Sequence, residues 1–160
     1  MNSIQFRAEE DWTVAELETF LHQLNILYSR LYIVDQFKGR GRLNLSRILA
    51  RPVSLIPRDE QLMVDYIEMH SPALIGLKGV DKIIKQLRLS VRDACDHSRR
   101  RDEDARDSFD WFIGVMKENG FSQEEIQDFI RNNFQKPRSP VKKILKLTKK
   151  LGVFLDSDAE

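Results

Sequence analysis

The sequence of 160 residues is short of the side chains that build metal and disulfide sites, with one cysteine and three histidines. A single cysteine excludes an intrachain disulfide and any zinc site made from several thiolates. His22, His70 and His97 show neither of the H-x-x-x-H and H-E-x-x-H spacings that hold zinc on a helix. We therefore expect no metal and no cofactor, and a fold stabilised by an ordinary apolar core.

Long apolar runs and an excess of one charge are also missing. No stretch approaches the roughly 18 apolar residues that suggest a transmembrane helix, and the N-terminus lacks the basic and apolar regions of a signal peptide. The 26 Lys and Arg nearly balance the 25 Asp and Glu, for a net charge of +1. We expect a cytoplasmic protein in which any electrostatic function depends on local clusters of charge.

Hydrophobic periodicity predicts one α-rich α+β domain over residues 1–155, followed by a tail at 156–160. The clearest element is the first helix, where Thr13 and Glu16 have the spacing of a capping box. From Val14 onward, apolar residues recur at steps of three and four to about Val34. This stripe predicts a helix that packs one face on the core.

Shorter segments predict a small sheet of two to four strands. Alternating or β-branched residues indicate strands at 3–7, 62–70 and 153–155, and a short strand at Val53–Ile56. Glycines and arginines make residues 36–60 a basic loop region, with a helical turn near 45–49. We interpret "GLKG" at 76–79 as the turn that enters the next helix, because it matches neither a P-loop nor a dinucleotide fingerprint.

A long charged helix is predicted over residues 79–119. As one straight helix it would be about 60 Å long at 1.5 Å per residue, so part of it should project from the domain or bend near residue 100. Within it, "ACDHSRRRDEDARD" at 94–107 resembles a reactive cluster. On a helix, however, Cys95 and His97 point about 200° apart, and the charged residues form self-neutralising pairs three and four residues apart. We expect a solvated surface there and no catalytic site.

The last helix is predicted at 139–151, with Ser139 as its cap, Pro140 at its first position and Gly152 as the residue that ends it. It has an apolar stripe, and the segment around it is basic, with no acidic residue between Arg131 and Gly152. Three interpretations remain open: a helix docked on the core with solvated lysines, a face that binds nucleic-acid phosphates together with the basic loop, or an amphipathic helix on an anionic membrane or an acidic partner. The candidate binding residues are Lys136, Arg138, Lys142, Lys143, Lys146, Lys149 and Lys150.

A second candidate surface is aromatic. Phe109 and Phe112 share one side of the long helix, and Trp111 points away from it. A tryptophan outside the apolar stripe is typical of the edge of a core or of an oligomer contact. We expect these three residues to contribute to self-association through helix packing.

The order of features resembles one group of bacterial proteins. A capped helix "WTVAELETFLHQLNILYSRLY" precedes "LMVDYIEMHSPALIGLKGVDKIIKQL", a charged helix, "GFSQEEIQDFI" and a basic segment. This order is similar to that of small α+β adaptor modules of bacterial conflict and immune signalling, the TRADD-N-like group. The resemblance covers about residues 12–155 and implies an interaction module without catalysis. It assigns no functional residues.

The sequence therefore predicts a non-enzymatic adaptor domain that binds a protein partner or a second copy of itself, with bacterial defence signalling implied by the resemblance. The alternative is a sequence-nonspecific nucleic-acid-binding protein that uses the basic C-terminal helix. A small enzyme with an unrecognised site is the third hypothesis, and we do not expect membrane-surface binding.

Overall fold

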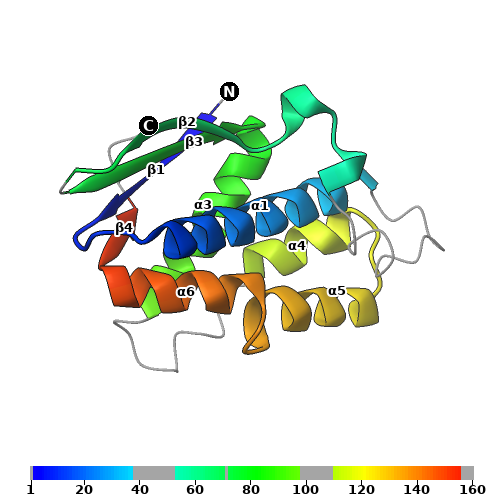
Figure 1. The fold of residues 1–160 in the computed structure, drawn as a ribbon. Helices are drawn as coiled ribbons and strands as arrows, with labels where there is room; N and C mark the ends of the chain where they lie inside the picture. The colour runs from blue at the N-terminus through cyan, green and yellow to red at the C-terminus, as the bar shows by residue number, and fades with distance from the viewer. Residues whose placement is uncertain (1, 38–52, 71, 98–109, 156–160) are drawn as a thin grey trace.

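The computed structural model describes residues 2–37, 53–70, 72–97 and 110–155, and it has an α+β fold in which helices cover one face of an antiparallel sheet (Figure 1). In chain order the elements are β1 (Asn2–Ala8), α1 (Val14–Phe37), the 3₁₀ turns η1 (Val53–Leu55) and η2 (Arg58–Glu60), β2 (Met63–Glu68), β3 (Ala73–Gly79), α3 (Asp81–His97), α4 (Asp110–Glu118), α5 (Gln123–Ile130), the π-helical turn η4 (Arg131–Gln135), α6 (Pro140–Leu151) and β4 (Val153–Leu155).

The sheet has four strands in the order β2-β3-β1-β4. The strands predicted at 3–7, 62–70 and 153–155 are confirmed as β1, β2 and β4. All three strand pairs are antiparallel, and β2 shifts register between Val64 and Tyr66, where it carries a bulge. The predicted α+β class with a small sheet is therefore correct.

The prediction of a turn at residues 76–79 is wrong, because they belong to β3, a central strand. The alternation was present in the sequence: Ala73, Ile75 and Leu77 are buried at every second position. Gly76, between two of them, is covered by the ring of Tyr66 on the neighbouring strand, and a Cβ at Gly76 would overlap that ring. The glycine is thus required by close packing across the sheet and does not mark a turn.

The segment before β2 also differs from expectation. The predicted strand at Val53–Ile56 is wrong, since residues Val53–Leu55 form a 3₁₀ turn. The helical turn predicted near 45–49 lies outside the described residues, as does most of the predicted basic loop.

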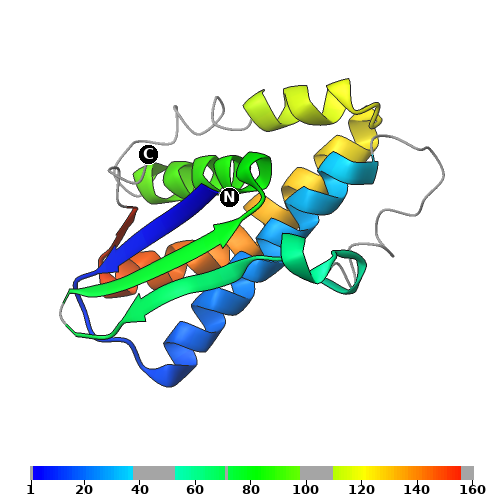
Figure 2. The ribbon, with the colours of Figure 1, turned by 90° about the horizontal axis from the view of Figure 1, so that it is seen from above.

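Helix α1 begins as predicted and runs three residues further than expected, to Phe37. The capping box is confirmed: the backbone N–H of Glu16 donates to Thr13 Oγ1, and the N–H of Thr13 donates to Glu16 Oε1, both at 3.1 Å. The placement of Val14 in the core is wrong, because its side chain is 83% exposed. Val14 lies in the first turn of α1, which extends past the edge of the sheet (Figure 2).

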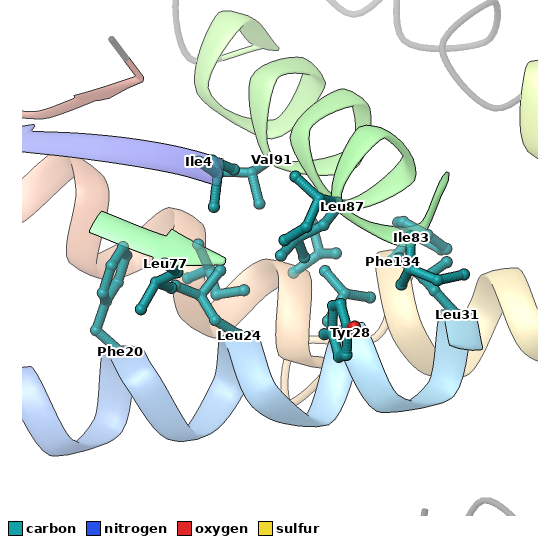
Figure 3. Close-up of a cluster of buried hydrophobic side chains, with 14 of the residues drawn as sticks. Ile4, Phe20, Leu24, Tyr28, Leu31, Leu77, Ile83, Leu87, Val91 and Phe134 are labelled. Atoms are coloured by element: carbon teal, nitrogen blue, oxygen red, sulfur yellow. The ribbon is translucent and has the colours of Figure 1, made fainter. Parts of the chain in front are cut away.

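The elements form layers, with the sheet uppermost, α1 beneath it and α6 beneath α1 (Figure 1). Helix α3 packs beside α1 and along β1, and it also contacts α6 (Figure 2). Side chains from α1, α3 and the strands meet in the main core, where Leu24, Leu77 and Leu87 are almost completely buried (Figure 3). Because α1 is covered by the sheet on one side and by α6 on the other, it is the central element of the fold.

The predicted helix over 79–119 is not one straight rod. The described parts are two separate helices, α3 and α4, along which the chain runs in opposite directions (Figure 2). Residues 98–109, where a bend was expected, lie outside the described residues. Ten of the fourteen residues of the charged stretch at 94–107 fall in this part of the chain, and the first four belong to α3.

Candidate functional site

Helix α6 is held at both ends by local sequence signals, and both were predicted. The side chain of Ser139 accepts a hydrogen bond from the Lys142 N–H at 3.4 Å, and Pro140 occupies the first turn. At the other end Gly152 takes the left-handed conformation, with φ of 60°. The orientation of the helix is set by an apolar stripe in which Val141, Ile144 and Leu151 are each 5% exposed or less.

The five lysines of α6 all stand on the side opposite this stripe. At 100° per residue they cover an arc of roughly 120° centred away from the buried positions, and all five are exposed. We call this surface the lysine face; it consists of Lys142, Lys143, Lys146, Lys149 and Lys150. Lys136 and Arg138, in the turn before α6, are exposed as well and extend the same basic segment.

Only one member of the lysine face has a carboxylate partner among the described residues. Lys150 Nζ lies 3.0 Å from Glu16 Oε2, which links the end of α6 to the start of α1. Hydrogen bonds from the Thr13 backbone and from Lys150 lower the pKa of Glu16. The other four lysines face solvent without an ion pair in the part of the chain that the structure describes.

This arrangement is unfavourable for the isolated helix. Lys142, Lys146 and Lys150 follow one another at intervals of four residues, and like charges at that spacing cost a few tenths of a kcal/mol per pair. A solvated helix that had only to be soluble would be more stable with glutamates interspersed. The lysine face therefore costs the helix a little stability that the buried stripe does not require.

Charge is also separated along the chain. Residues 131–152 contain eight basic and no acidic residues, which leaves 18 of the 26 basic residues and all 25 acidic residues elsewhere, an excess of seven negative charges. The small net charge of +1 is thus the sum of a basic segment, residues 131–152, and an acidic remainder. A cluster of this kind attracts polyanions even when the whole protein is almost neutral.

Of the three interpretations of α6, the structure argues against insertion into a membrane. Insertion of an amphipathic helix into a bilayer requires a free apolar face, and the apolar stripe of α6 is buried against the core. No described helix is both long enough and apolar enough to cross a membrane. What α6 offers to a partner is charge, without an apolar anchor.

The aromatic candidates do not form a free surface. Phe112 is fully buried and its ring centre lies 5.1 Å from that of Phe129 and 5.6 Å from that of Phe134. Its prediction as an oligomer contact is wrong, because the α4 stripe is used for packing on α5 and η4. Trp111 is half-buried with its ring against Phe112, and Phe109 lies outside the described residues.

No cluster of three or more metal-ligating side chains occurs among the described residues. His22 and His70 are exposed and lie on different elements, and His70 Nε2 is 3.9 Å from Glu68 Oε2. The side chains of Cys95 and His97 are outside what the structure describes, so the interpretation of that pair stays a prediction.

Buried polar contacts were missed by sequence reasoning. Tyr28 Oη accepts from the Val80 N–H at 2.9 Å and donates to the Glu60 carbonyl at 2.6 Å, while Tyr32 Oη donates to the Glu60 carboxylate. Asp35 is nearly buried and pairs with Lys82 Nζ at 2.6 Å. These contacts join residues more than 25 positions apart, and no local pattern marks them.

Comparison with known proteins adds no relative: protein-family models, curated proteins and solved structures each contain no match to this chain.

Proposed function

We propose that the protein is a non-enzymatic interaction domain that binds phosphate-rich polyanions, nucleic acid in particular, through the lysine face of α6. The observation that supports this most directly is the set of four exposed lysines without a carboxylate partner among the described residues, on a helix whose other side is buried.

Binding would be electrostatic and independent of sequence. Lysine ammonium groups neutralise phosphates and release the counterions condensed on the nucleic acid. Reading bases requires side chains in a groove, and binding single strands usually requires aromatic rings on which bases stack. The described part of α6 has no aromatic side chain, so the lysine face suits the backbone of a duplex.

The proposal is tested by fluorescence anisotropy with a labelled duplex of random sequence, about 20 bp long, between about 50 and 200 mM salt. Four contacted phosphates predict a slope of about −3.6 in a plot of log affinity against log salt, which is roughly a 150-fold loss over that range. Absence of binding at about 50 mM salt would reject the proposal.

A matched pair of variants locates the site. Lys142→Gln with Lys146→Gln should reduce the salt slope by about two. The control, Lys85→Gln with Lys117→Gln, removes the same charge from exposed positions on α3 and α4 and should leave the slope unchanged. Equal weakening by both variants would mean that only net charge matters, and the lysine face would lose its assignment.

An adaptor that joins protein partners is the second proposal. Phe112, one of the three residues predicted for self-association with Phe109 and Trp111, is buried in the core. The observation that favours a protein partner lies instead at the edge of the sheet.

A further inference from the structure

The two edges of the sheet differ. On one edge, β4 pairs with residues Phe6–Ala8 of β1. Beyond β4, helix α3 packs along β1: Asp81 Oδ1 accepts from the N–H of Asn2, and Arg88 donates to the carbonyl of Ser3. On the opposite edge, β2 pairs with β3 alone among the described strands. One edge is closed, and the other presents backbone N–H and C=O groups outward.

Exposed apolar side chains gather along the open edge. Val64 and Ile67 lie opposite Leu77 and Ile75 in the sheet, and both of these partners are buried, so Val64 and Ile67 belong to the core-facing side. They are nevertheless 52% and 37% exposed, because no described strand lies beside them. Of the five large apolar side chains that are exposed among the described residues, Val64 and Ile67 lie on β2 and Met69 directly follows it; the other two are Leu55 in η1 and Val14 at the start of α1.

Helix α1 supplies a floor under the space beside β2. Seen from above, its N-terminal half passes out beyond the strand (Figure 2). Val14, Leu21 and Tyr28 are spaced seven residues apart and share one side of the helix. Tyr28 on that side contacts Glu60, just before β2, and Val80, just after β3. The exposed Val14 and the half-buried Leu21 therefore lie on the side of α1 that faces the sheet layer.

The open edge is acidic. Turn η2 and strand β2 together contain four acidic residues and one basic residue, Arg58. Lys78 on β3 pairs with Asp65 at 3.6 Å, and Glu60 is held by Tyr32. Glu68 points to the outer face, opposite Leu74, and is exposed, with His70 Nε2 at 3.9 Å from its carboxylate. An incoming strand would thus meet apolar side chains on its inner face and a carboxylate on its outer face.

We propose that the β2 edge binds an extended segment of a partner protein, which adds to the sheet as a further antiparallel or parallel strand. Backbone hydrogen bonds to β2 hold the segment, its alternate apolar side chains pack on Val64, Ile67 and the α1 floor, and a basic residue between them pairs with Glu68. The inference is independent of polyanion binding by α6.

A second copy of the chain fits this edge less well than a single segment does. It would bring an equally acidic strand against β2, and its own α1 would need space in the layer that this α1 already occupies. An isolated basic-apolar segment brings neither problem. The acidic edge and the space taken by α1 therefore favour a single partner strand with alternating apolar and basic residues.

The test uses a capped peptide of about eight residues that alternates valine with lysine, titrated into the ¹⁵N-labelled protein. We expect amide shifts and slower hydrogen exchange across residues 63–69. A valine–glutamate peptide should bind at least about tenfold more weakly. A valine–lysine peptide N-methylated along one edge should lose binding, since it cannot donate hydrogen bonds to β2.

Exposed positions give variants that do not threaten folding. Glu68→Gln should weaken the valine–lysine peptide several-fold, while Glu124→Gln, the same change on exposed α5, should not. Ile67→Thr should weaken it further, and Ile67→Val should restore most of the affinity. Absence of shifts at 63–69, equal binding of the N-methylated peptide, or protection of β2 that rises with protein concentration without peptide would each overturn the proposal, the last by assigning the edge to a second copy.

Discussion

Two tyrosines of α1 hold the segment that leads into β2. Tyr28 bridges the Glu60 carbonyl and the Val80 N–H, and Tyr32 donates to the Glu60 carboxylate. Burial and the hydrogen bond to Glu60 raise the pKa of Tyr32 to about 12 from its ordinary value of 10.0. Glu60 is thus fixed through both its backbone and its side chain, which sets the position where the open edge of the sheet begins.

The first prediction concerns Tyr32 and pH. The folded protein binds the phenolic proton more tightly than the unfolded chain does, so this stabilisation is complete below pH 10 and is lost as pH rises through about 12. Wild type should be more stable than Tyr32→Phe at neutral pH, and the difference should shrink over that window. Urea unfolding followed by tryptophan fluorescence at a series of pH values measures it. A difference that stays constant or grows with pH would contradict the assigned hydrogen bond.

At the scale of elements, α6 combines a buried stripe that fixes its orientation with a lysine face that destabilises it. Burial of Ile144 and Leu151 fixes one side of the helix and does not require lysines on the other. A helix selected for stability alone would mix charges on its outer side.

The second prediction uses this conflict. Lys146→Glu should stabilise the protein, by about 0.5 kcal/mol, because the new carboxylate lies four residues from Lys142 and Lys150 and three from Lys143 and Lys149. The same variant should weaken duplex binding more than Lys146→Gln, which removes a charge without adding one. Urea unfolding and anisotropy on the three proteins give both quantities. A loss of stability, or unchanged binding, would show that the lysines of α6 serve the fold.

Elements that depend on neighbouring residues were predictable from the sequence, and those that depend on distant contacts were not. The Thr13–Glu16 box at α1 and the Ser139 cap of α6 are set within a few positions, so both were found. The β3 strand was missed because the glycines at 76–79 were interpreted as a turn. Gly76 is required instead because the ring of Tyr66, on another strand, lies against it.

The candidate sites divide in the same way. The lysines of α6 are exposed as expected, since a stripe of apolar residues on one side of a helix determines the other side. Phe112 was misplaced because spacing alone cannot tell whether an apolar helix face meets its own chain or another one. The link from Lys150 to Glu16 and the open β2 edge became visible only when segments far apart in sequence were placed together.

At the scale of the whole molecule, the two proposed surfaces have opposite charge and lie on opposite sides. The sheet with β2 is uppermost and α6 is the lowest layer, with α1 between them (Figure 1). Charges in solvent are largely screened beyond about 8–10 Å at physiological salt. A change of charge at one surface should therefore leave the binding affinity of the other unchanged.

The third prediction follows from this separation. Lys142→Gln with Lys146→Gln should leave the affinity for the valine–lysine peptide within about twofold of wild type, and Glu68→Gln should leave duplex affinity within the same margin. Titration of both ligands against both variants, at one salt concentration, measures the four values. A large effect across the molecule would mean that α1 transmits a change between the sheet and α6.

The close contact between Tyr66 and Gly76 has a consequence for recognition. Together with the bulge at the same place, it allows only one alignment of β2 on β3, since a slip by one residue would push the tyrosine ring onto a side chain and turn Ile67 to the other face. The open edge therefore has a fixed register before any partner arrives. A segment that is already extended would lose the least conformational entropy on binding.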